Sequence, residues 1–231
     1  MLKGSYRESG MEPFNEVLAS MICEVVGLDH VEYTIEVIHG KVLSKYECFI
    51  DTNTELLSAY SILHYHEVDI RPMNQYVYES YVKILKSKGL ENVESCLAKM
   101  FVLDYLMANV DRHLGNFGII RNVETLKWVK IAPNFDSGQA LFSQKKVYEM
   151  NFNNATGRFF NKNDIDFEII IEKIIKNIDF DIDFNALYDV AKKWKDMLIS
   201  NQYISKISPE RIEIITDGFK QRVRKLEKNL K

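Results

Sequence analysis

The chain has 231 residues, of which 46% are apolar and 27% are charged, a balance typical of a folded domain with a hydrophobic core. Its net charge of −3 provides no general electrostatic attraction to nucleic acid or to an anionic membrane. The sequence shows neither a secretory signal peptide nor an apolar run of the roughly 20 residues that a membrane span requires. Cys23, Cys48 and Cys96 have no Cys-x-x-Cys spacing and fit a reducing compartment, so a cytoplasmic protein is expected.

The first fifty residues are predicted to form a small β-rich part. Apolar residues of the first helix recur with the period of one helical face, and Gly27 follows as a C-cap. The next segment alternates apolar and polar residues and turns at a glycine, which predicts a β-hairpin. The expected elements are a strand end at Leu2–Lys3, a helix over residues 14–26, and a hairpin with strands over 31–38 and 42–50.

The remainder of the chain is predicted to be mostly helical, because long stretches carry apolar residues at helical spacing. The expected order is helices over 74–87 and 92–108, strands over 117–121 and 127–131, an irregular stretch to about residue 163, and helices over about 164–177, 184–200 and 209–229. This order predicts an α+β fold with a β-rich part over residues 1–50 and a helical part over 51–231.

A polar loop between the second of these helices and the strand at 117 carries residues that suggest chemistry. Asp111 and Asn116 are five positions apart, so a curled loop can bring a carboxylate and an amide oxygen together. Asp136 comes twenty positions later, at the end of a strand–turn–strand ribbon whose two ends lie side by side. Phosphoryl transfer needs two oxygen ligands for Mg²⁺ and one carboxylate for the attacking hydroxyl. The pattern predicts Asn116 and Asp136 as metal ligands and Asp111 as the base.

A purely structural interpretation of the same three residues is the alternative. In it Asp111 caps a turn, Asn116 adopts a left-handed backbone conformation, and Asp136 opens a turn before Gly138.

Two further groups near the N-terminus fit a nucleotide site. A kinase needs a strand lysine that contacts the phosphates and a helix glutamate that holds the lysine. Lys3 lies on the first predicted strand and Glu16 in the first turn of the first helix, although a surface lysine and a glutamate stabilising a helix start would look the same. The end of the hairpin, Glu47, Cys48 and Phe49, precedes the helical part and is either a hinge for adenine or an ordinary strand end.

Three segments of the sequence resemble the HipA-like serine/threonine kinases, whose fold is related to protein and phosphoinositide kinases. They are Pro13–Glu16, Asn109–Gly118 and Ile131–Gly138, and their order and spacing match over residues 1–145. The resemblance implies that Asp111 is the catalytic base and that Asn116 and Asp136 bind Mg²⁺. It also implies that Lys3 contacts the phosphates, that residues 47–49 form the hinge, and that His113 supports the catalytic loop.

Members of this family transfer the γ-phosphate of ATP to Ser or Thr of proteins, and several are toxins held by a helix-turn-helix antitoxin. They carry additional strands and a phosphate-covering loop before the lysine, whereas only Met1 and Leu2 precede Lys3 here. The expectation is therefore a shortened form of a longer kinase, a kinase whose missing strands are supplied by a partner, or a natural remnant with weak or no turnover. An exposed sheet edge favours an antitoxin-like protein or a dimer partner at this place.

Three functions follow as hypotheses. The first is a kinase that uses ATP and Mg²⁺ to phosphorylate a protein. The second is a non-catalytic nucleotide-binding or regulatory module that works with a DNA-binding, antitoxin-like partner. The third is a small-molecule phosphotransferase, which would need an acidic substrate pocket in the helical part. Asp179, Asp181 and Asp183 form an acidic run there, for which a solvated connection between helices is the alternative.

Overall fold

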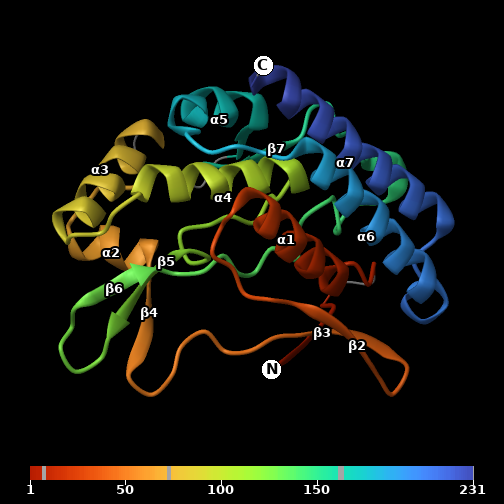
Figure 1. Cartoon of the computed structure of the whole chain (residues 1–231), viewed down its shortest axis with the longest axis horizontal. Helices are drawn as coiled ribbons and strands as arrows, with labels where there is room; N and C mark the ends of the chain where they lie inside the picture. Colours follow the sequence, from red (N-terminus) through yellow and green to blue (C-terminus); the bar gives the residue numbers. More distant parts are fainter. Residues whose placement is uncertain (7–8, 72–73, 161–163, 231) are drawn as a thin grey trace.

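The computed structural model describes residues 1–6, 9–71, 74–160 and 164–230. Two small antiparallel sheets lie on one side of the molecule and most helices on the other, with α1 and α4 next to the sheets (Figure 1). The expected α+β fold is confirmed.

The first sheet carries the N-terminus and is covered by α1 (Glu12–Val26). Its strands are β1 (Leu2–Gly4), β2 (Thr34–Ile38) and β3 (Lys41–Lys45), in the order β1-β3-β2. Helix α1 ends at Gly27 in the left-handed region (φ 64°), where its N–H bonds to the carbonyls of the last turn, as a glycine C-cap does. The prediction of a strand up to residue 50 was wrong, because regular pairing in this hairpin ends at Lys45.

The second sheet contains a strand that the sequence analysis missed. Strand β4 (Thr54–Ser58) pairs with β5 (Gly118–Asn122), which pairs with β6 (Trp128–Ile131). A Cβ at Gly118 would lie 2.1 Å from Leu57 O, so only glycine permits this close approach of β4 and β5. The ribbon predicted from two strands is therefore a three-stranded sheet.

The helices form a layer around α4 (Val93–Met107), which is buried along most of its length. The prediction of a helix from residue 164 was wrong in its first turn, because residues 164–166 pair with the strand β7 instead. The other elements are α2 (Ala59–Tyr65), α3 (Asn74–Ser87), the 3₁₀ turns η1 (Val147–Glu149) and η2 (Ile175–Asn177), β7 (Thr156–Arg158), β8 (Asp164–Asp166), α5 (Phe167–Ile174), α6 (Phe184–Ser205) and α7 (Pro209–Leu230). Within the described residues, none of these helices combines the length and apolarity needed to cross a membrane.

The three cysteines differ in exposure, and this difference makes a simple prediction. Cys23 is buried, Cys96 is partly buried and Cys48 is exposed. Burial raises the pKa of both Cys23 and Cys96, the latter to about 11. Since the thiolate is the reactive form, a thiol reagent at neutral pH should modify Cys48 rapidly and the other two much more slowly. Mass spectrometry of the folded and the urea-unfolded chain tests this, and two fast thiols in the folded chain would contradict it.

Candidate active site

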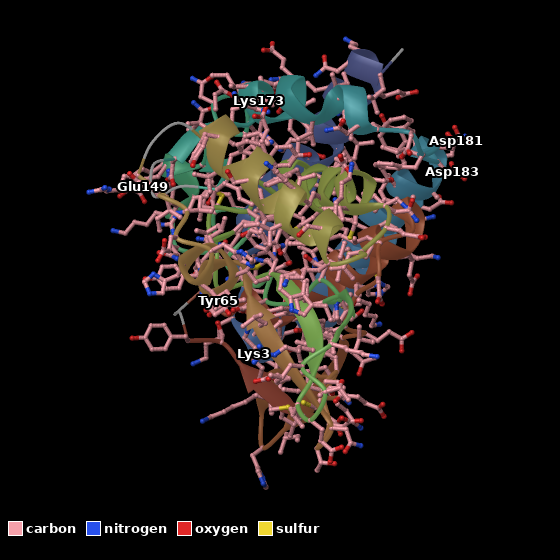
Figure 2. All side chains as sticks on the ribbon, turned by 90° about the vertical axis from the view of Figure 1, so that its left-hand side faces the viewer. Lys3, Tyr65, Glu149, Lys173, Asp181 and Asp183 are labelled. Carbon is pink, nitrogen blue, oxygen red and sulfur yellow. The ribbon has the colours of Figure 1, made fainter. Side chains whose placement is uncertain are left out.

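Charged side chains from three distant parts of the chain meet beneath α1. Lys3 Nζ on β1 lies 2.6 Å from Glu16 Oε1 of α1 and also donates a hydrogen bond to Asp136 Oδ1. The second oxygen of Glu16 accepts a hydrogen bond from the backbone N–H of Ser137 at 2.9 Å. Figure 2 shows Lys3 at the level of the strands, below the helices. The structure thus brings Lys3, Glu16 and Asp136 into one cluster.

The electrostatics of this cluster keep Lys3 charged. Burial by itself would lower the pKa of Lys3, but the carboxylates of Glu16 and Asp136 outweigh this effect, and the pKa is raised. Glu16 is fully buried, whereas 41% of the Asp136 side chain is exposed. Asp136 has a φ of 56°, a left-handed conformation that costs energy for a residue other than glycine and is concentrated at functional sites. The carboxylate that an incoming ligand could reach is therefore that of Asp136.

The loop between α4 and β5 is held in a compact turn by its own hydrogen bonds. The backbone N–H of His113 donates to Asp111 O at 2.8 Å, and that of Asn116 donates to His113 O at 2.9 Å. The side-chain amide of Asn116 also donates to Asp111 O, at 3.0 Å. Because the amide nitrogen of Asn116 is used within the loop, its Oδ1 is the atom left for a ligand among the described contacts. This oxygen and the carboxylate of Asp136 are of the hard type that suits Mg²⁺.

Arg112 connects this loop to the segment around Asp136, and the sequence analysis overlooked it. Its side chain is buried, and Nε and Nη2 each lie 2.9 Å from an oxygen of the buried Asp104 on α4. The guanidinium also donates to two backbone carbonyls and two side chains on either side of the cluster, namely Asn116 O, Phe135 O, Asn134 Oδ1 and Ser137 Oγ. One side chain thus ties both candidate metal-ligand segments to α4. The available signal was Asp104, a carboxylate within the otherwise apolar second half of α4.

The first turns of α1 fix the segment that follows Asp136. Asn15 Nδ2 donates to Gly138 O and Ala140 O, both at 2.9 Å, and the Asn15 side chain is fully buried. A Cβ at Gly138 would lie 3.1 Å from Glu12 Cβ and from Glu16 Oε1. Asn15 is therefore a further residue that the sequence analysis did not single out.

The predicted hinge lies apart from the charged cluster. Glu47 and Cys48 are exposed, and the Phe49 ring packs on that of Phe135 with 5.2 Å between centroids. Residues 47–49 line a cavity of about 650 Å³, but Lys3 and Asp136 are not among the described residues of its lining. Phe135, the neighbour of Asp136, is therefore the described link between the predicted hinge and the cluster.

His113 is exposed on the outer side of the loop, where its Nδ1 accepts a hydrogen bond from the N–H of Gly115 at 3.1 Å. None of the contacts described for His113 reaches Lys3, Glu16 or Asp136. The described hydrogen bond of the His113 side chain is therefore a local one within the loop.

The acidic run before α6 also lies away from the site. Asp181 and Asp183 are at the far edge of the molecule from Lys3 in Figure 2. Asp179 accepts a hydrogen bond from Ser95 Oγ at 2.6 Å, and Asp183 caps α6 by accepting from Ala186 N–H at 3.0 Å. In the described part of the chain, no group of three or more His, Cys, Asp or Glu side chains is placed to hold a metal ion.

Comparisons with known proteins support the fold. No protein-family model matches the chain, and no curated protein sequence matches it significantly. The Helicobacter pylori proinflammatory kinase CtkA has a similar structure, with a TM-score of 0.63, 20% sequence identity, and coverage of 98% of this chain and 91% of that chain. HipA of Shewanella oneidensis MR-1, in complex with HipB and operator DNA, has a TM-score of 0.52 at 10% identity. That match covers 97% of this chain and 57% of HipA. The chain therefore has a HipA-like kinase fold.

Proposed function

We propose that the chain is a HipA-like kinase domain that transfers the γ-phosphate of ATP to Ser or Thr of a protein substrate. The observation that carries the proposal is the contact of Lys3 with both Glu16 and Asp136, in a fold shared with the kinase CtkA and with HipA. A lysine held by a helix glutamate, next to an aspartate that can bind a metal, is the arrangement that phosphoryl transfer uses.

Each residue then has a distinct task. Glu16 positions the ammonium group of Lys3, which contacts the phosphates, and Asp111 accepts the proton of the attacking hydroxyl. Asn116 Oδ1 and Asp136 would hold Mg²⁺, which neutralises charge on the phosphates when bound. Arg112 holds the segments of both ligands in place through buried hydrogen bonds.

A non-catalytic nucleotide-binding module with a partner is the second candidate. The observation that favours it is the position of β1 at the edge of its sheet, where it pairs with β3 among the described strands. An edge strand can accept a strand from another protein. HipA itself is seen with HipB, so we infer an antitoxin-like protein or a second copy as the kind of partner. A small-molecule phosphotransferase is less favoured, because the acidic run lies far from Lys3 (Figure 2).

Calorimetry with Mg-ATP tests the role of Lys3. Replacing Lys3 by Met and Glu16 by Gln together removes both charges, so that no unpaired carboxylate is left buried. The double variant is expected to bind ATP about 10- to 100-fold more weakly, because hydrogen bonds to charged groups contribute about 1.5–3 kcal/mol. Lys130→Met is the matched control, since Lys130 pairs with Asp29 at the surface.

A transfer assay on Ser- and Thr-containing peptides separates the two candidates. Binding of Mg-ATP with transfer supports the kinase, and binding without transfer supports the module. Absence of Mg-ATP binding by the folded chain would overturn both.

A further inference from the structure

A cavity of about 410 Å³ opens on the outer side of the loop that carries Asp111. Tyr60, Ile70 and Leu114 give it an apolar surface, and Arg158 of β7 provides a cationic group. Its lining consists of Ser58, Tyr60, Ile70, His113, Leu114, Gly115 and Arg158. We propose that this cavity binds the substrate protein next to its phosphoacceptor, and that it selects a segment with an apolar side chain beside an acidic one. The proposal rests on the proposed kinase function.

The position of the cavity relative to Asp111 supports an acceptor site. Three of its lining residues, His113 to Gly115, belong to the compact turn that begins at Asp111. The backbone N–H of His113 donates a hydrogen bond to Asp111 O at 2.8 Å, so this wall of the cavity and the candidate base belong to the same turn. An extended peptide advances about 3.3 Å per residue. A serine a few residues from a side chain held in the cavity can therefore extend along the turn that carries Asp111.

The charge of the cavity favours an acidic neighbour over a basic one. The linings of four other cavities each include at least one carboxylate, whereas the residues described for this one include none. Arg158 Nε lies 3.4 Å from Asp164 Oδ1, and about a third of its side chain is exposed. Charge-assisted hydrogen bonds are usually about 2.7–2.9 Å long, so this contact is weak. The guanidinium of Arg158 therefore retains donors for an incoming carboxylate.

The apolar part of the cavity is partly preordered. Tyr60 is half exposed, and its ring stacks on that of His64 with 6.0 Å between centroids and an interplanar angle of 5°. The backbone N–H of Tyr60 also donates to Leu114 O at 2.9 Å, which ties α2 to the catalytic loop. An aromatic wall held in this way can take up an apolar side chain with little loss of conformational entropy.

Reversing the charge of residue 158 in the cavity, and that of one residue in the peptide, tests the proposal. The probes are fluorescein-labelled peptides that each contain one serine and one leucine. In each peptide, a single Asp or Lys is placed at a different position near the leucine. Fluorescence anisotropy measures the binding of each peptide to the full chain. At the best position, Asp should bind up to about 5-fold more tightly than Lys, because an exposed ion pair contributes up to about 1 kcal/mol. Arg158→Glu should reverse this preference, while Arg224→Glu on α7 should leave it unchanged.

The reversal is a gain of binding for Lys peptides, so a poorly folded variant cannot produce it. Ile70→Ala should weaken the binding of leucine peptides and leave that of glycine-substituted peptides unchanged. Equal binding of Asp and Lys peptides, or the same preference in Arg158→Glu, overturns the acceptor site. Calorimetry with Mg-ATP on the same variants keeps the two proposals apart. A reversal without ATP binding supports a peptide site and refutes the kinase, whereas ATP binding without a reversal refutes only the peptide site.

Discussion

Replacing Arg112 by Met is expected to lower the free energy of unfolding by about 3–5 kcal/mol, the usual cost of removing one partner of a buried ion pair. Asp104 is almost fully buried and would lose both hydrogen bonds from the guanidinium. The carbonyls of Asn116 and Phe135 would lose a donor as well. Urea unfolding monitored by circular dichroism measures the change.

Arg121→Met is the matched control. Arg121 also pairs with a carboxylate, Glu55, at 2.7 Å, but the two side chains are 27% and 41% exposed. Such a pair contributes about 0–1 kcal/mol, so this variant should lose far less stability. If Arg112→Met loses no more unfolding free energy than Arg121→Met, the buried contacts of Arg112 do not stabilise the fold. In the double variant Asp104→Asn/Arg112→Met, the free energy of unfolding should fall by less than the sum of the two single losses, because both changes remove the same interaction.

Asp136→Asn is expected to reduce phosphate transfer by at least about 100-fold, since even outer-shell partners of metal ligands typically contribute 10- to 100-fold. The variant keeps an oxygen atom but loses the negative charge that would attract Mg²⁺. Its stability should change by less than about 1 kcal/mol, because the Lys3–Asp136 pair is partly exposed. The measurements are the transfer rate and the dependence of ATP affinity on Mg²⁺ concentration.

Asp29→Asn serves as the control for this variant, because Asp29 also pairs with a lysine but lies at the surface. It should retain the transfer rate and the Mg²⁺ dependence of the unaltered chain. If Asp136→Asn and Asp29→Asn behave alike in both measurements, the assignment of Asp136 as a metal ligand is wrong.

The α+β class and most helices followed from the sequence, because apolar periodicity is a local property. Helix α1 was predicted from its apolar face and from Gly27, and it extends over Glu12–Val26. The spacing of Asp111, Asn116 and Asp136 in the sequence also predicts that the three residues belong to one site. A polar loop after a long apolar helix is a local pattern as well.

The strand β4 could not be predicted in the same way. Its residues Thr54–Ser58 are all only partly buried, so the segment shows no clear alternation of buried and exposed positions. Its conformation depends on pairing with β5, more than sixty positions later in the chain (Leu56 with Ile120). Pairing between strands this far apart in sequence depends on the tertiary fold, and the strand propensity of the segment alone does not predict it.

The arrangement of polar groups in the site likewise depended on the tertiary structure. The contact of Lys3 with Asp136 joins residues 133 positions apart, and Arg112 reaches acceptors on three separate segments. Buried charges are tolerated only where the fold supplies partners. Sequence spacing therefore predicted Asn116 and Asp136 as one pair of candidate ligands, whereas folding placed Lys3 against Asp136 and the buried Arg112 between their segments.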